Sequence, residues 1–355
     1  MKAIVNKYVN IRIGNPEVKI DNNPAYYHPG DEVEIADTVI GDNINGNKIW
    51  FQLTNGSFLS SEGIANPFPS WIEDFGINEL WNYTRGENIT VIIIDSGFAN
   101  CDDVTTNKVS SLSLIDNSKG LDNIGHGTLM ASIIAGMGKS IAGIAKEVNI
   151  VALKITNVQG EISPEVFIKA LDKIFELAER SINCIVNCSL RLQFDISQND
   201  LQTIQSKINK LSSDFNVIFV AAVGNESQSI KTIPAGLQNV ISCAGFYKSP
   251  EGKYSLLIDS NYWPDIKVTA HSTFPSKQLN NIFPLGVSEQ GSSHACAFIS
   301  GLVSLVSSRA KQKKRDIDFS FVSDFIKSSS LTINSNNNPF KILDKKLLLQ
   351  NFKNI

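Results

Sequence analysis

The 355-residue sequence predicts an α/β protein: a doubly wound, mostly parallel sheet with helices on both faces, preceded by a small all-β barrel. From about residue 71 onward, nearly continuous apolar runs alternate with amphipathic segments, as parallel strands alternate with crossover helices. Before residue 65, short strand-like runs are separated by turn residues. Residues 65–70 (ANPFPS) hold two prolines in three positions. Because proline opposes both helix and central strand, we expect a linker there.

The predicted N-terminal domain covers residues 1–64. Three segments of it look like strands: Tyr8 to Ile13, Glu32 to Ile35 and Ile49 to Leu53. Turn residues separate them: Gly14-Asn15-Pro16, Pro29-Gly30-Asp31 and Asn55-Gly56. The strings VNIRIGNP, HPGDEVEI and WFQLTNGSFL resemble bacterial SH3-like modules. That resemblance implies a peptide or cell-wall ligand, and docking onto or gating the larger domain is an equally open alternative.

The predicted larger domain covers residues 71–355. Five apolar segments are expected as buried parallel strands: Ile89 to Asp95, Val148 to Ile155, Cys184 to Leu190, Val217 to Ala222 and Val240 to Ala244. Three amphipathic segments are expected as helices: Thr128 to Met137, Pro164 to Arg180 and Leu201 to Ser213. Ser163 followed by Pro164 is a favourable helix start. Ligands of such sheets bind at the carboxyl ends of the strands.

Composition excludes several kinds of partner. A hydrophobic content of 42%, a charged content of 19% and a formal net charge of −3 indicate an ordinary globular protein. They give no electrostatic reason to expect nucleic acid or an anionic membrane. The basic run from Lys311 to Arg315 is expected on a solvated face. The first residues alternate polar and apolar types without a signal-peptide core, and no segment approaches the ~20 apolar residues of a membrane span.

The cysteines indicate a reducing compartment. The chain has five cysteines, an odd number: Cys101, Cys184, Cys188, Cys243 and Cys296. Their spacing lacks the pairs that a disulfide framework would show. The four-residue spacing of Cys184 and Cys188 would suggest a metal pair on a helix. Their segment INCIVNCSL is typical of a strand instead, so we expect small buried hydrophobes. We therefore expect a cytoplasmic protein with no metal or other cofactor, since no clustered acidic loop suggests calcium.

Three segments near the predicted strand ends each hold one reactive side chain. VIIIDSG places Asp95 at the end of an apolar strand, with Gly97 allowing a sharp turn. DNIGHGTLMASIIAG places His126 just before an apolar helix, and GSSHACAFISG places Ser293 in the first turn of another. Each alone has an ordinary structural explanation as a turn former, a helix-start residue or a helix cap.

Taken together, these segments resemble the subtilisin-like serine proteases over about residues 71–350. The aspartate, histidine and serine motifs of that family match at Asp95, His126 and Ser293, in the chain order known for subtilisin. VAAVGNES matches the Ala-Ala-Gly-Asn segment of the family and places Asn225 after a buried strand. The resemblance implies an Asp–His–Ser triad with Asn225 as oxyanion donor, hydrolysing peptide bonds of a polypeptide substrate through an acyl-enzyme.

The resemblance also implies a substrate-binding edge. In the family an extended peptide adds as a strand beside a Ser-Leu-Gly segment, here Ser189-Leu190-Arg191, so Arg191 replaces glycine. The segment before Asn225 contributes Ala222, Val223 and Gly224. Lys231 and Thr232 stand near the expected specificity pocket. Two cations around one pocket, Arg191 and Lys231, favour a substrate with an acidic or polar residue before the scissile bond. The alternative is that both are solvated residues on the rim of the pocket.

Departures from the family motif leave other functions open. Ala297 replaces the proline that usually follows the nucleophile, which predicts a straighter helix. His294, next to the nucleophile, faces away from it on a helix and either lines the pocket or packs. A catalytically silent scaffold with the same fold is one rival interpretation, although no triad member is lost. Peptide ligation or ester hydrolysis by the same acyl-enzyme is another.

Overall fold

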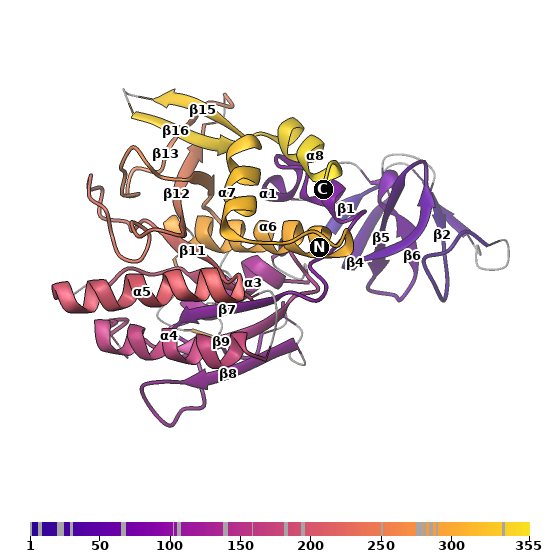
Figure 1. The fold of residues 1–355 in the computed structure, drawn as a ribbon. Coiled ribbons are helices and arrows are strands. Elements are labelled where there is room, and N and C mark those ends of the chain that lie inside the picture. The colour runs from indigo at the N-terminus through magenta and orange to yellow at the C-terminus, as the bar shows by residue number, and fades with distance from the viewer. Residues whose placement is uncertain are drawn as a thin grey trace.

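The computed structural model describes residues 2–5, 9–19, 25–28, 31–64, 69–101, 103–104, 108–137, 141–157, 159–180, 184–192, 196–249, 251–274, 279, 282–283, 287–288, 290–335 and 338–355. The larger part of the chain is built on one twisted sheet with helices on both of its faces (Figure 1). Small antiparallel sheets from the N-terminal residues lie to one side of it, at the right of the same view.

The large sheet is mostly parallel, as the sequence predicts. Its strands run in the order β15-β16-β14-β12-β11-β10-β7-β9-β8, with β13 paired to β12. The bounds are β7 (Thr90–Asp95), β8 (Val109–Ser113), β9 (Asn149–Lys154), β10 (Cys184–Cys188), β11 (Ile218–Ala222), β12 (Val240–Lys248), β13 (Tyr254–Leu256), β14 (Val268–His271), β15 (Ser330–Ser335) and β16 (Asn338–Leu343). Among the strands that the structure describes in this sheet, the β12–β13 and β15–β16 pairs are antiparallel and the others are parallel.

Strand β7 shows why these strands are apolar throughout. Side chains alternate between the two faces of a strand, so Val91 and Ile93 enter one hydrophobic cluster while Ile92 and Ile94 enter another. All four are fully buried. The first cluster includes the inward faces of α3 (His126–Ala135) and α6 (Ser292–Gln312), and the second those of α4 (Pro164–Ala178) and α5 (Gln198–Phe215). Helices on both faces confirm the predicted fold class.

Local sequence signals set the helix starts. The Ser163 hydroxyl accepts from the main-chain N–H of Val166 at 3.3 Å and caps α4, and Ser197 caps α5 through the N–H of Asp200. Helix α6 runs unbroken for 21 residues through Ala297. Two short helices precede the large sheet, α1 (Ser70–Glu73) and α2 (Ile77–Leu80). Two more follow α6 in the chain, α7 (Phe319–Ser328) and α8 (Lys345–Lys353).

The N-terminal residues form antiparallel strands, compatible with the predicted all-β character. One sheet has the order β1-β4-β5-β6, and β2 pairs with β3 separately. The bounds are β1 (Lys2–Ile4), β2 (Val9–Ile11), β3 (Ala25–Tyr27), β4 (Glu32–Ile44), β5 (Asn47–Leu53) and β6 (Phe58–Ser60). Of the predicted linker, residues 65–68 lie outside the described residues, and Ser70 begins α1. The SH3-like assignment stays a prediction.

Buried charge joins the N-terminal strands to the larger part. Lys146, whose side chain is fully buried, lies 3.9 Å from a carboxylate oxygen of Asp37 on β4 and over the ring of Trp81. Burial, assisted by nearby Arg85, lowers the pKa of Lys146 to about 7, although Asp37 opposes the change. The main-chain N–H of Lys48 on β5 also donates to Asn82. Asn82 precedes β7 and Lys146 precedes β9 in the chain, so both contacts lie at the amino ends of the parallel strands.

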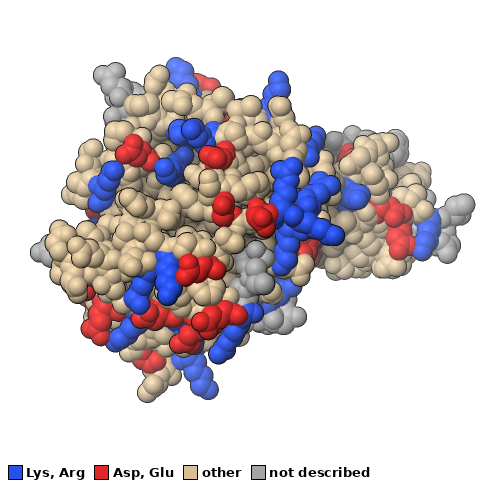
Figure 2. Space-filling view, viewed as in Figure 1, with Lys and Arg blue, Asp and Glu red and all other residues tan. Residues whose placement is uncertain are grey.

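The basic run from Lys311 to Arg315 is exposed, as expected from the sequence. On the face shown in Figure 2, basic side chains gather over the carboxyl end of α6, next to the N-terminal strands. In the part of the chain that the structure describes, no helix combines the length and apolar character needed to cross a bilayer.

All five cysteines are free thiols, and only Cys101 is partly exposed. Cys184 and Cys188 both lie on strand β10, as predicted, and not on a helix. Within the described ranges, no group of three or more histidine, cysteine, aspartate or glutamate side chains is arranged to hold a metal ion.

Candidate active site

Asp95 is the last residue of β7 and lies at the carboxyl end of the sheet, 3% exposed. Its Oδ1 accepts from the main-chain N–H of Ser96 at 2.7 Å and from the Ser96 hydroxyl at 3.2 Å. Gly97 then turns the chain with φ +106°, and a Cβ there would come within 2.3 Å of the Gly120 carbonyl oxygen. The glycine of the aspartate motif is therefore required both by its conformation and by this close approach.

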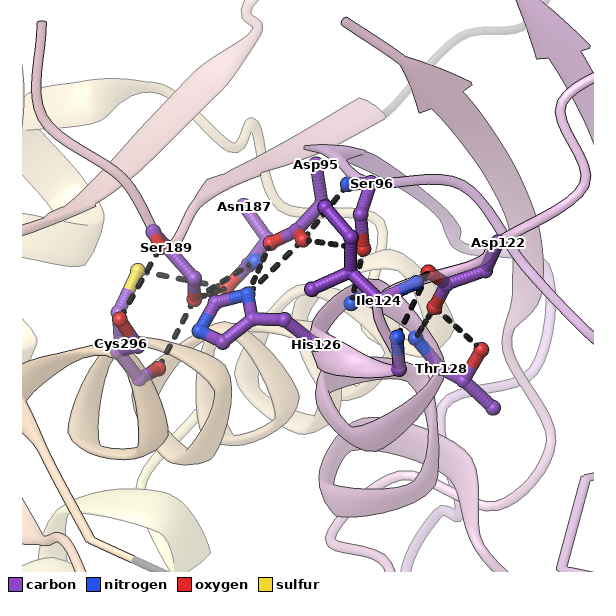
Figure 3. Close-up of polar contacts among 12 residues, drawn as sticks. Asp95, Ser96, Asp122, Ile124, His126, Thr128, Asn187, Ser189 and Cys296 are labelled. Carbon is purple, nitrogen blue, oxygen red and sulfur yellow. Dashed lines mark hydrogen bonds and ion pairs between the residues drawn. The ribbon is translucent and has the colours of Figure 1, made fainter. Parts of the chain in front are cut away.

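His126 is the first residue of α3, one position past Gly125, which has φ +94°. The loop before it is held by Asp122. One Asp122 oxygen accepts from the N–H groups of Ile124 and Gly125, and the other accepts from the N–H and hydroxyl of Thr128. Four hydrogen bonds to one carboxylate fix the turn and thereby aim the imidazole toward Asp95 (Figure 3).

Asp95 and His126 form a close pair. The imidazole Nδ1 lies 2.8 Å and 2.9 Å from the two carboxylate oxygens, and the His126 side chain is 30% exposed. Burial opposes the charged imidazole, but the charge and hydrogen bond of Asp95, with a further contribution from Asp122, outweigh it and raise the pKa of His126. The carboxylate thus fixes the tautomer with a proton on Nδ1, leaving Nε2 as a base.

Ser293 lies in the first turn of α6 and is 9% exposed. Its hydroxyl donates to the main-chain oxygen of Ser189 at 3.1 Å, and the Ser189 hydroxyl donates back to the main-chain oxygen of Ser293 at 2.9 Å. In the described residues, the main-chain oxygen of Ser189 accepts from the Ser293 hydroxyl, and no hydrogen bond joins this hydroxyl to His126. Proton transfer to the imidazole requires the hydroxyl to exchange this acceptor for His126.

Asn225 follows β11 and is exposed. Its Oδ1 accepts from the N–H of Ser292 at 2.8 Å, which fixes the orientation of the amide. Within the described residues Nδ2 has no hydrogen-bond partner, and it remains available as a donor. Gly224 before it has φ +96°, which favours glycine, and a Cβ there would come within 2.6 Å of the Asn261 amide and 2.7 Å of the Glu226 carboxylate.

One cavity of about 270 Å³ unites these groups. Its lining includes all four predicted catalytic residues, Asp95, His126, Asn225 and Ser293, and five of the predicted substrate-binding residues, Ser189, Leu190, Arg191, Ala222 and Gly224. A base, a hydroxyl and an amide donor on one cavity wall form the set that acyl transfer requires.

The model of the subtilase family (Peptidase_S8) matches residues 38–341, which is most of the chain. This chain belongs to the subtilase family. It is 28% identical over 241 residues to the minor extracellular protease Epr of Bacillus subtilis, a match covering 66% of this chain and 35% of that protein. To the thermostable alkaline protease of Halalkalibacterium halodurans it is 26% identical over 229 residues, covering 63% and 58%. The chain thus matches only part of each relative.

Solved structures share the fold of this subtilase. A lanthipeptide protease superposes with a TM-score of 0.62 at 17% identity, covering 79% of this chain and 93% of that one. A cold-adapted subtilisin-like serine proteinase superposes with a TM-score of 0.58 at 20% identity, covering 74% and 90%. At these sequence identities the structural likeness establishes the fold alone. The chemistry of the site must be argued from the residues of this chain.

Of the two cations predicted around the cavity, Arg191 and Lys231, only Arg191 is among the described residues that line it. Lys231 lines a different cavity and pairs with Asp265 at 3.3 Å. Thr232 is buried and donates to the main-chain oxygen of Val223, whose own side chain is fully buried. None of these three lines the catalytic cavity among the described residues. Sequence position near the pocket gave no information on which way each side chain points.

Arg191 does line the cavity of this subtilase, but its charge is matched. Its Nε donates to Glu226 at 2.6 Å, and Asn261 donates to the other oxygen of the same carboxylate at 2.5 Å. Glu226 also lines the cavity. Glu226 and Asn261 were not predicted from the sequence, since residues 35 positions apart carry no local sign of pairing.

His294 packs beside the site and lies outside the cavity lining. It is 1% exposed, its ring stacks on Phe274, and its Nε2 donates to the main-chain oxygen of Ser288 at 3.0 Å. Burial lowers the pKa of His294 to about 3, with the nearby His126 adding to the shift. The imidazole of His294 is therefore neutral and acts as an aromatic core residue.

Proposed function

We propose that this subtilase is a serine endopeptidase that hydrolyses polypeptides through an acyl-enzyme. The observation that carries the proposal is the Asp95–His126 pair, at 2.8 Å, in the same cavity as Ser293 and the Asn225 amide. Each group matches one requirement of acyl transfer: an oriented base, a nucleophile and an oxyanion donor.

In the proposed reaction the Ser293 oxygen attacks the scissile carbonyl carbon while His126 Nε2 takes the hydroxyl proton. The oxyanion of the tetrahedral intermediate accepts hydrogen bonds from Asn225 Nδ2 and the main-chain N–H of Ser293. The imidazolium, stabilised by Asp95, then gives its proton to the leaving amine as the C–N bond breaks. Water, activated by His126 in the same way, hydrolyses the ester and returns the serine hydroxyl.

The substrate is proposed to bind as an extended strand beside Ser189-Leu190-Arg191. Binding there offers the main-chain oxygen of Ser189 a substrate N–H in exchange for the Ser293 hydroxyl that now occupies it. The exchange would free the nucleophile for His126. Because Arg191 is paired with Glu226, its charge is balanced, and an acidic preference loses its electrostatic basis.

The N-terminal strands are proposed to act as an intramolecular partner of the larger part. Their contacts through Asp37 and Lys48 support docking. Those contacts lie at the amino ends of the parallel strands, opposite Asp95, which argues against direct covering of the cavity. A separate peptide ligand of these strands and a cytoplasmic location remain predictions.

Incubation of the purified protein with heat-denatured casein tests the proposal, with the variants D95A, H126A and S293A beside it. We expect new fragments from the wild type and none above background from S293A. Fragments from all four proteins at equal rates, or from none, would favour a catalytically silent scaffold. Adding a short peptide amine separates hydrolysis from ligation, because a ligase would join that peptide to the new carboxyl ends.

A further inference from the structure

Asn187, on β10, is a fully buried polar residue directly behind the nucleophile. Its Nδ2 donates to the Ser189 hydroxyl at 3.0 Å. Its Oδ1 accepts from the Ser300 hydroxyl at 2.9 Å and from the Cys296 thiol at 3.3 Å. A buried amide is costly unless it is hydrogen-bonded, and this amide uses both of its ends (Figure 3).

The amide reaches two parts of the site, the first turns of α6 and Ser189, whose hydroxyl also lies 3.3 Å from Asn187 Oδ1. Cys296 and Ser300 lie three and seven positions after Ser293, so all three share one face of α6. Ser189 starts the proposed substrate edge and exchanges two hydrogen bonds with Ser293. Asn187 therefore connects the strand that would hold the substrate to the helix that carries the nucleophile.

We propose that Asn187 is a positioning residue, which through Ser189 sets the place of the Ser293 hydroxyl relative to the substrate edge. The inference rests on the proposed peptidase function. In the described part of the chain, no hydrogen bond of Asn187 goes to Asp95 or His126. Loss of Asn187 should therefore misplace the nucleophile without changing the basicity of the imidazole.

Three variants separate the two ends of the amide. N187A removes both ends, and S189A removes only the end toward the nucleophile. S300A is the matched control, because it removes one hydrogen bond from Asn187 deeper along α6 and leaves the bond to Ser189 intact. If N187A does not fold, S189A carries the same test with a smaller deletion. The double variant N187A/S189A tests whether the two residues act as one unit.

Steady-state hydrolysis of a peptide substrate gives the decisive comparison. We expect N187A and S189A to lower kcat by roughly 10- to 100-fold, since misplacing a reacting group by about 1 Å costs up to about 10²-fold. KM should stay within about twofold, the acid limb of the pH profile should not move, and the double variant should be no slower than the slower single variant. S300A should keep kcat within about twofold. Equal losses of kcat in N187A and S300A, or a shifted acid limb in N187A, would overturn the positioning role.

Hydrogen exchange in the first turn of α6 keeps this inference separate from the proposed function. If the wild type neither hydrolyses peptides nor reacts with a fluorophosphonate, the peptidase proposal fails. The positioning role then stands if exchange there is faster in N187A and S189A than in S300A. It falls if the three variants exchange alike.

Discussion

Replacing Asp95 by asparagine removes a charge from the site while keeping its shape. In the wild type the His126 ring lies 2.8–2.9 Å from the Asp95 oxygens, and proton transfer from Ser293 turns this ring into a cation. Two unit charges about 4 Å apart interact by about 4 kcal/mol at an effective dielectric constant of about 20. At about 1.4 kcal/mol per factor of ten, D95N should lower kcat by about 10³-fold.

The same substitution also changes the tautomer. An asparagine amide that donates to Nδ1 moves the imidazole proton to Nε2, where it cannot accept the serine proton. The value of about 10³-fold is therefore a lower bound. S96A serves as a control, because it deletes a hydrogen bond to Asp95 and the acceptor of the Gly127 N–H but keeps the carboxylate against the imidazole.

Steady-state hydrolysis of a peptide substrate between pH 5 and pH 9 is the assay. The raised pKa of His126 predicts that wild-type kcat/KM increases through an acid limb lying above the ordinary imidazole value of 6.5, as the base loses its proton. D95N should move this limb downward. A D95N variant that loses less than about tenfold in kcat, or keeps the wild-type limb, would refute the assigned role of Asp95.

Three further predictions concern other parts of the molecule. N225A should lower kcat by about 10²–10³-fold with little change in KM, which is the range known for the corresponding amide donor of subtilisin; a loss confined to KM would exclude the oxyanion role. K146M should raise the free energy of unfolding at pH 6, because it removes a cation whose burial lowers its pKa to about 7 and leaves Asp37, which is 23% exposed, in contact with solvent; calorimetry showing a lower melting temperature would contradict this. The pKa of Lys146 is about 7 in the folded chain and 10.5 as the ordinary value, so the unfolded chain binds more protons between these values. The Lys146 contribution to wild-type stability should therefore rise with pH there, and K146M should lack that rise. R191G should free Glu226 and raise cleavage after basic residues at least about fivefold in a peptide library, from an attraction of about 1 kcal/mol; an unchanged profile would show that Glu226 does not face the substrate.

The three residues of the proposed triad could be selected from the sequence because each belongs to a short local pattern. Asp95 ends an apolar strand before a glycine turn, and His126 and Ser293 begin helices after glycine. Buried parallel strands also have a strong local signal, and all five predicted strands are present with boundaries that differ by a few residues. Glu32 to Ile35 was predicted as a strand and is the first part of β4, but the continuation of β4 to Ile44 and the β15–β16 hairpin were not predicted.

The remaining features of the site depend on contacts between distant residues. The Arg191–Glu226 pair joins positions 35 apart, and the Asn187–Ser300 hydrogen bond joins positions 113 apart. Lys231 sits near the pocket in sequence but turns toward Asp265. No local sequence pattern shows which of several nearby polar groups a side chain will bond to. The substrate preference of the cavity was therefore harder to predict than the residues proposed to carry out the reaction.

Mass spectrometry of the protein after reaction with a fluorophosphonate tests the central claim most directly, because the reagent reacts preferentially with a serine that an adjacent base activates. We expect one adduct, on the peptide containing Ser293, lost in S293A and strongly slowed in H126A. An unmodified Ser293 in folded protein, or the same labelling in S293A, would contradict the assignment of this cavity as a working active site.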